Sequence, residues 1–223
     1  MKPVLLYTLP RTRATALLMS STRTIKLNEP FSVSHLCPRQ TPDESLVAYT
    51  TCEQRITDGQ WNNILENINN KDSCTKIHAM DLVTSKRGRI WYQTALENCS
   101  HEIYVVVRNR FNLALSYIIA RQFGWDSYSE KEPFEFEVTE SMIMEVALHF
   151  DHFFRFWPTG SKVITAETRP MGDFQPSLSG WPKQNSEQKY KYITNYKWCQ
   201  SRIFDVIDYY DEEWKNRVGY LAS

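Results

Sequence analysis

Ile103-Tyr-Val-Val-Val-Arg108-Asn-Arg-Phe-Asn112-Leu-Ala-Leu-Ser116 is the stretch of sequence that decides the fold. A run of strand-forming residues ends in an arginine, and a serine follows within a helical pattern, which predicts a strand that turns directly into a helix. The guanidinium of Arg108 could hold a phosphate by two hydrogen bonds. Asn112 is the predicted N-cap, and Ser116 would lie near the electropositive start of the helix. The alternative is purely structural: a buried strand, a surface arginine and a helix serine.

A second strand, turn and helix occur at the start of the chain. Val4–Leu9 reads as a buried strand, Pro10–Thr15 as a polar turn and Ala16–Met19 as the start of a helix. Backbone N–H groups at such a turn can surround an anion. Additional side-chain donors come from Arg11, Thr12, Arg13 and Thr15. The glycines and the Gly-Lys-Ser/Thr ending of a Walker P-loop are absent, which argues against a magnesium-dependent NTPase.

Composition narrows the class of protein. The chain has 223 residues, enough for a single α/β domain over residues 1–223. Its formal net charge is zero, so a general nucleic-acid binder is not expected. The five cysteines include no Cys-x-x-Cys pair, which favours reduced thiols and a cytoplasmic location. We expect no signal peptide and no membrane span, because the first strand begins near Met1 and no apolar run approaches ~20 residues.

Strand and helix patterns alternate along the chain. We predict strands near residues 4–9, 24–27, 74–79, 102–107 and 162–166. We predict helices near residues 14–22, 57–70, 88–98, 112–123, 139–156 and 196–209. This alternation predicts an α/β fold with three α/β/α layers and a mostly parallel central sheet. Because ligands bind at the carboxyl ends of such strands, Arg11, Glu29, His78 and Arg108 are expected to converge there.

Five segments, in order along residues 4–170, resemble the family of sulfotransferases that use 3′-phosphoadenosine 5′-phosphosulfate (PAPS), whose fold is P-loop NTPase-like. Pro10–Leu17 is similar to the family's 5′-phosphosulfate loop, and Arg108–Ser116 to its 3′-phosphate motif Arg-Asn-Pro-x-Asp-x-x-x-Ser. Asn28–Phe31 resembles an Asp/Asn-Glu-Pro-Phe turn, Lys76–His78 a Lys-x-His strand, and Val163–Glu167 a later core strand.

The chain departs from this family at several positions. Arg110 stands where the family usually has proline, Asn112 where it has aspartate, and Arg13 where it has glycine. The Arg-Lys-Gly-x-x-Gly motif near the C-terminus of the cytosolic enzymes is missing, which leaves part of 3′-phosphate binding unassigned.

The resemblance implies transfer of a sulfuryl group from PAPS to a hydroxyl or amine, with no metal required. It implies that the nucleotide is held by Arg11, Thr12, Arg13, Ala14, Thr15, Ala16, Arg108, Ser116 and, on a basic loop after the last strand, Lys183. Arg11 would stabilise the leaving phosphate, and Lys76 would share the strand face of His78. Either Glu29 or His78 would be the base, and the N-terminal block favours Glu29. The acceptor stays open between a sugar, a peptide, a lipid and a small metabolite.

Two other interpretations remain open. The chain could be a non-catalytic nucleotide-binding protein of the same fold, or a P-loop kinase-like enzyme, although its missing glycine-lysine motif disfavours the latter. His149 and His152 have the i, i+3 spacing of metal ligands on a helix, but no third ligand is evident. The apolar residues around them favour a core helix.

Overall fold

The computed structural model describes residues 1–32, 56–123, 134–165, 174 and 190–218. These residues form a five-stranded sheet in which every pairing is parallel. The strands are β1 (Val4–Thr8), β2 (Ile25–Asn28), β3 (Ser73–His78), β4 (Glu102–Val107) and β5 (Lys162–Thr165). Their order across the sheet is β2-β3-β1-β4-β5, which places β1 in the centre. The five predicted strands are confirmed to within one residue at each end.

The central strand is buried on both faces. All five residues of β1 are buried, as expected for a parallel sheet covered by helices on each side. Leu5 and Tyr7 belong to the larger hydrophobic cluster, whereas Val4 and Leu6 belong to the smaller one. Since successive side chains of a strand point to opposite faces, the two clusters lie on opposite faces of the sheet.

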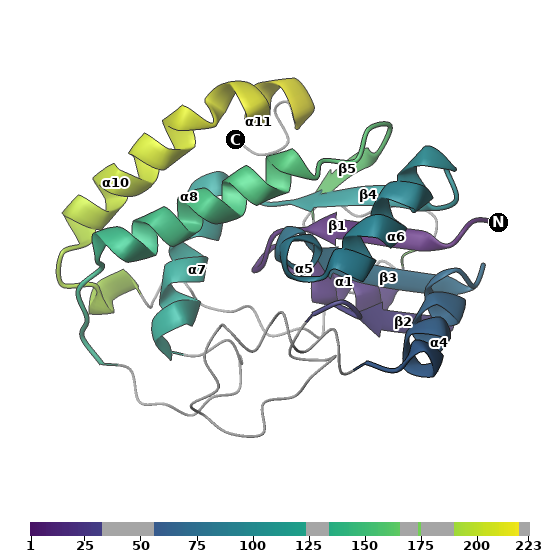
Figure 1. Ribbon diagram of the computed structural model, residues 1–223. Helices are drawn as coiled ribbons and strands as arrows, with labels where there is room; N and C mark the ends of the chain where they lie inside the picture. Colours follow the sequence, from purple (N-terminus) through teal and green to yellow (C-terminus); the bar gives the residue numbers. More distant parts are fainter. Residues whose placement is uncertain (33–55, 124–133, 166–173, 175–189, 219–223) are drawn as a thin grey trace.

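Helices cover both faces and complete an α/β fold with three layers (Figure 1). They are α1 (Ala14–Ser20), α4 (Asp58–Ile68), α5 (Ala79–Thr84), α6 (Lys86–Glu97), α7 (Arg110–Phe123), α8 (Glu140–Arg155), α10 (Tyr196–Tyr209), α11 (Asp211–Arg217) and the 3-10 turn η1 (Tyr190–Tyr192). Helix α1 packs on the smaller cluster, and α4 to α8, α10 and α11 contribute to the larger one. Each helix of the described ranges is too short or too polar to cross a lipid bilayer.

The helix boundaries correct part of the prediction. Helix α7 begins at Arg110, so Asn112 lies inside it and is not its N-cap. The Asn109 side chain takes that role, because its Oδ1 accepts a hydrogen bond from the Asn112 amide at 3.0 Å. The sequence also failed to predict α5, α11 and η1, which are too short to show a helical repeat.

The carboxyl end of β1 is held against α8 by Tyr7. Its ring stacks on Phe153 with centroids 5.3 Å apart and planes within 2°. Its hydroxyl donates a hydrogen bond to the Phe153 carbonyl at 2.8 Å. Since Tyr7 lies next to the last residue of β1, shortly before the polar turn, this contact helps to fix where the chain leaves the sheet.

Candidate functional site

The carboxyl ends of four strands bring the predicted polar residues together. Arg11 follows β1, Glu29 follows β2, His78 ends β3 and Arg108 follows β4. Arg108 Nη1 lies 3.4 Å from the Arg11 carbonyl oxygen, and His78 Nε2 lies 3.5 Å from Glu29 Oε1. The four residues thus lie at the same end of the sheet in two pairs: an arginine half beside β1 and β4 and a carboxylate half beside β2 and β3.

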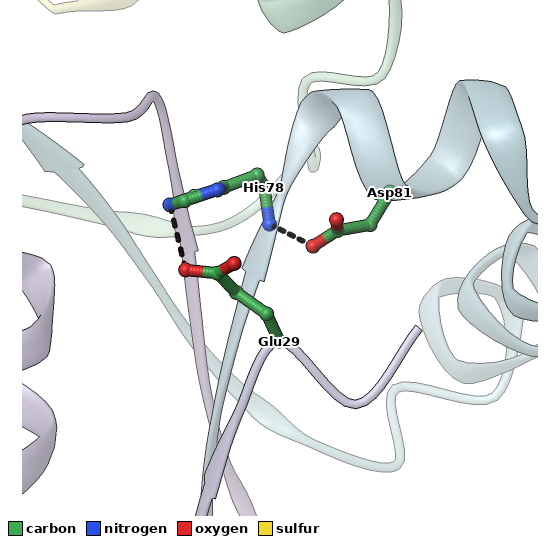
Figure 2. Close-up of side chains that lie close together, drawn as sticks. All are labelled: Glu29, His78 and Asp81. Atoms are coloured by element: carbon green, nitrogen blue, oxygen red, sulfur yellow. Dashed lines mark hydrogen bonds and ion pairs between the residues drawn. The ribbon is translucent and has the colours of Figure 1, made fainter. Parts of the chain in front are cut away.

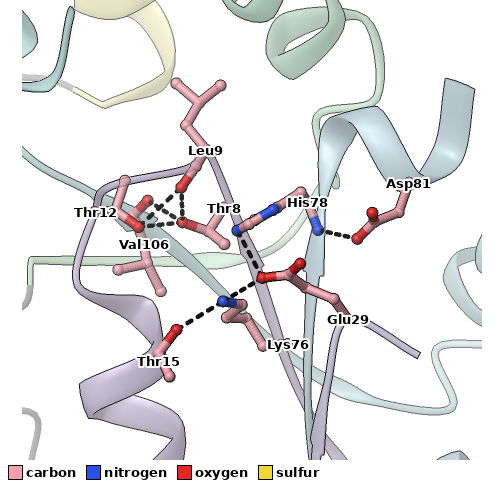
Figure 3. Close-up of polar contacts among 9 residues, drawn as sticks. All are labelled: Thr8, Leu9, Thr12, Thr15, Glu29, Lys76, His78, Asp81 and Val106. Atoms are coloured by element: carbon pink, nitrogen blue, oxygen red, sulfur yellow. Dashed lines mark hydrogen bonds and ion pairs between the residues drawn. The ribbon is translucent and has the colours of Figure 1, made fainter. Parts of the chain in front are cut away.

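The turn after β1 is built by its own hydroxyl groups. Thr12 is buried, and its Oγ1 donates to the Leu9 carbonyl at 3.1 Å and also contacts the Thr8 hydroxyl (Figure 3). The Thr12 side chain therefore braces the turn from inside. The Ala16 amide donates to the Arg13 carbonyl at 3.0 Å and is used within the helix.

Two predicted nucleotide-binding positions lie at the start of α1. Ala14 and Thr15 occupy its first turn, where amides have no acceptor within the helix itself. Their backbone N–H groups are therefore the suitable anion donors of this turn.

The backbone is strained at the turns of the site. Among the described residues, the non-glycine residues with positive φ are Arg11 (70°), Arg13 (63°), Glu29 (52°) and Cys99 (47°). Three of these four belong to the candidate site. A side chain in this region costs of order 1 kcal/mol, and such strain is concentrated at functional sites. Arg13 adopts the conformation for which the family's usual glycine is suited.

The arginine half places two positive charges close together. Arg11 Nε donates to Ser116 Oγ at 3.3 Å, so the turn after β1 contacts the first turns of α7. Burial and then the nearby guanidinium of Arg108 lower the pKa of Arg11 below its ordinary value. An anion between the two side chains would relieve this repulsion, which makes the arginine half a suitable phosphate site.

Arg110, which stands where the family has proline, does not join this pair. Its Nη1 lies 2.9 Å from Asp211 Oδ1, which ties α7 to α11. This neighbour in sequence therefore has a structural partner of its own.

Lys76 and Glu29 form the centre of the carboxylate half. The Lys76 side chain is 4 % exposed, and its Nζ lies 2.6 Å from Glu29 Oε1. The same ammonium donates to Thr15 Oγ1 at 2.7 Å, so one charge joins β3, the turn after β2 and helix α1 (Figure 3). A buried charge needs such partners, because its lost hydration is otherwise uncompensated.

The turn that carries Glu29 is anchored by Phe31. Phe31 is fully buried, with ring centroids 5.5 Å from Trp61 and 5.2 Å from Trp91. Gly88 approaches it so closely that a Cβ there would lie 2.8 Å from the Phe31 ring. Because Gly88 has no side chain, Phe31 can pack in this buried position. The packed ring in turn fixes the turn that carries Glu29.

His78 is uncharged near neutral pH. Burial lowers the pKa of His78 to about 3, although the nearby Glu29 carboxylate opposes the shift. The imidazole therefore faces Glu29 as a neutral ring with one lone pair. It is suited to orient a substrate hydroxyl, while its low basicity weakens it as a proton acceptor.

Asp81 also belongs to the site, although the sequence did not predict it. It is buried in the first turn of α5, and its Oδ2 accepts a hydrogen bond from the His78 backbone N–H at 2.8 Å (Figure 2). Burial raises the pKa of Asp81 to about 7; the His78 amide opposes this shift and Glu29 adds to it. The usable signal was the three-residue spacing from the end of a strand to an acidic residue, which is typical of a capping box.

The histidines of α8 lie among packed side chains. His149 Nε2 contacts the Tyr117 hydroxyl at 2.6 Å, and burial, with a contribution from His152, lowers the pKa of His149 to about 4. In the described part of the chain, neither histidine belongs to a group of three possible metal ligands. His149 instead helps to line an apolar crevice beside the turn after β1, together with Leu9, Pro10, Leu113, Ala114, Tyr117, Val146 and Phe150.

One predicted nucleotide contact and part of one motif lie outside the described residues. These are Lys183 and the last two residues of Val163–Glu167. The first three residues of that motif lie in β5, as expected.

Comparisons with known proteins add no assignment. No family model, no curated protein and no solved structure matches the chain.

Proposed function

We propose that the protein is a sulfotransferase that moves a sulfuryl group from PAPS to a hydroxyl or amine of an acceptor. The observation that carries the proposal is the pairing of Arg11 with Arg108 beside a strained turn, at the same end of the sheet as a carboxylate and a neutral imidazole. Sulfuryl transfer needs positioning and charge stabilisation more than covalent chemistry, as phosphoryl transfer does.

The arginine half takes the nucleotide. Arg108 and Ser116 hold the 3′-phosphate, and the turn from Arg11 to Thr15 holds the 5′-phosphosulfate. Arg11 and Ser116 are in contact at 3.3 Å, so the two phosphate positions are neighbours. Arg11 turns from Ser116 toward the phosphosulfate when the nucleotide binds, and its charge stabilises the leaving phosphate.

The carboxylate half takes the acceptor. The bond from sulfur to the phosphate oxygen breaks as the bond from sulfur to the acceptor oxygen or nitrogen forms. Glu29 receives the acceptor's proton, and His78 orients the reacting group. Lys76 holds the Glu29 carboxylate in place through its 2.6 Å contact.

A non-catalytic nucleotide-binding protein is the second candidate. The same Lys76–Glu29 ion pair favours it, because a carboxylate already engaged by an ammonium is a weaker proton acceptor. This candidate predicts that the desulfated nucleotide, 3′-phosphoadenosine 5′-phosphate, binds while no acceptor is sulfated.

Calorimetric titration with two nucleotides tests the phosphate site. The desulfated nucleotide is compared with adenosine 5′-monophosphate, which lacks the 3′-phosphate. We expect Arg108→Ala to weaken binding of the first by ~2–4 kcal/mol, through loss of a charge-assisted contact, and to spare the second.

Arg110→Ala is the matched control, since Arg110 lies two residues away and pairs with Asp211. It should leave both affinities unchanged. An equal loss for the two nucleotides in Arg108→Ala, or no binding of either nucleotide to the wild type, contradicts the assignment.

A further inference from the structure

Three metal-ligating side chains meet at the ends of β2 and β3. Glu29, His78 and Asp81 each offer a ligand atom, and these atoms all lie within 4.8 Å of one another (Figure 2). The cluster joins a turn, a strand end and the first turn of a helix, so it depends on the fold and not on local sequence.

The spacing suits one shared ion. His78 Nε2 and Glu29 Oε1 are 3.5 Å apart. Two ligands of one tetrahedral ion, with bonds of about 2.1 Å, are separated by roughly 3.4 Å. Asp81 is already held toward the pair by its hydrogen bond to the His78 amide. One imidazole nitrogen and two carboxylates are a ligand set for zinc and similar divalent ions.

Lys76 sets the strength of such a site. Its ammonium lies 2.6 Å from Glu29 Oε1 and repels a second cation there. Its other partner, Thr15 Oγ1 at 2.7 Å, allows the ammonium to stay in place while the Glu29 carboxylate turns toward an ion. With Asp81 ionised, as it would be when it binds an ion, two carboxylates face one ammonium and the cluster has a net negative charge, which favours a divalent cation.

We propose that Glu29, His78 and Asp81 form a binding site for a divalent cation of the zinc type. The ion uses the lone pairs of Glu29 and His78, so it also switches off the reaction of the same residues. This inhibitory role rests on the proposed function, whereas the binding itself does not.

Cobalt(II) and Zn²⁺ are the probes for the binding test. The full chain is titrated without a purification tag and with Cys37, Cys52 and Cys99 replaced by serine, so that these thiols do not compete. Visible absorption reports the coordination of cobalt, and calorimetry with Zn²⁺ reports stoichiometry. We expect one ion per chain, and roughly ten-fold or weaker binding in each of Glu29→Gln, His78→Asn and Asp81→Asn.

Two further variants sharpen the result. His149→Asn removes another buried histidine outside the cluster and should leave the affinity unchanged. Lys76→Met removes the repelling charge and should strengthen binding by roughly ten-fold. If Asp81→Asn or Lys76→Met does not fold, Glu29→Gln and His78→Asn decide the question.

The outcomes separate this proposal from the proposed function. Binding that is absent below about 1 mM, or equal in wild type and ligand variants, overturns the metal site. Sulfuryl transfer that Zn²⁺ inhibits at its own dissociation constant supports both proposals. Ion binding by the three residues in a protein that transfers nothing supports the site and contradicts the sulfotransferase. Transfer that saturating Zn²⁺ does not affect contradicts the inhibitory role.

Discussion

Two ion pairs of equal length lie at opposite ends of the sheet. Lys76 and Glu29 are 2.6 Å apart at the carboxyl end, and Lys162 and Glu102 are 2.6 Å apart at the amino end. The first lysine is 4 % exposed and the second 65 % exposed. The two ion pairs therefore differ in their effect on stability, because an exposed pair adds little stability whereas a buried one is costly to break.

The polar groups around the two ion pairs also differ. At the amino end Glu102 also accepts from the Tyr104 hydroxyl at 2.8 Å, and the lysine contact lowers the pKa of Glu102. At the carboxyl end a second carboxylate and a pair of arginines crowd the site. The charges at the amino end are therefore paired at the surface, whereas the carboxyl end gathers several charged groups in partly buried positions.

The largest expected difference between the two glutamates is in turnover. Glu29→Gln should lower the rate of sulfuryl transfer by roughly 10²–10⁴-fold while sparing nucleotide affinity, because the amide accepts no proton. Glu102→Gln is the matched control and should leave the rate unchanged. Single-turnover assays across pH measure both, and His78→Asn should cost less than Glu29→Gln. A reaction abolished by His78→Asn and preserved in Glu29→Gln would identify the histidine as the base.

The two lysines should differ in stability. Lys76→Met should lower the free energy of unfolding by about 2–4 kcal/mol, because it leaves the Glu29 carboxylate without its ammonium. Lys162→Met should lower it far less, because solvent already screens the pair. Urea denaturation measures the free energy of unfolding of both variants. Equal losses would contradict the distinction between the two ends of the sheet.

Acid should affect the two ends unequally through their histidines. The pKa of His149, near the carboxyl end, falls to about 4 in the folded protein, below its ordinary 6.5. The folded state then binds fewer protons than the unfolded state between these values, so stability is lost as pH falls from 6.5 toward 4. Relative to His149→Gln, the wild type should lose about 2 kcal/mol over this window.

His101 at the amino end provides the comparison for this pH dependence. Burial lowers the pKa of His101 as well, but its contact with the Ile68 carbonyl, at 3.2 Å, opposes the shift. The loss relative to His101→Gln should therefore be smaller. Denaturation curves at several pH values measure both differences, and a larger effect at His101 would contradict the expectation.

The smallest expected effect concerns the strained turns. Arg13→Gly and Cys99→Gly each remove a side chain from a backbone with positive φ. Each should raise the free energy of unfolding by roughly 0.5–1 kcal/mol. Only Arg13→Gly should also weaken binding of the desulfated nucleotide, because Cys99 lies at the amino end. Thermal unfolding and calorimetry test the pair, and a nucleotide effect in Cys99→Gly would count against this division.

The strands and the N-terminal turn could be predicted because each is encoded by a short, continuous stretch of sequence. β1 is a continuous apolar run, and the polar residues follow it directly. Because the strands are parallel, the residues that follow them lie at one end of the sheet, whatever the order of the strands. These residues are Arg11, Glu29, His78 and Arg108. The convergence was therefore predictable from alternation alone.

The partners within the site were not predictable in the same way. Glu29 meets Lys76 because β2 pairs with β3, with Asn28 opposite Lys76, and strand order is a property of the whole sheet. Asp81 was missed because α5 spans only Ala79–Thr84 and shows no helical repeat. The error at Asn112 has a different cause: Asn109, three residues earlier, is an equally suitable cap in sequence.

The Lys76 ammonium also has a consequence for the order of folding during synthesis. β1 and β2 are consecutive in the chain, yet β3 is inserted between them. The first 32 residues leave the ribosome with the turn and Glu29 but without the strand that separates β1 from β2. Lys76 can join Thr15 and Glu29 only after residue 76 has emerged, so a ribosome-stalled chain that ends before β3 should contain Glu29 but leave the carboxylate half unassembled.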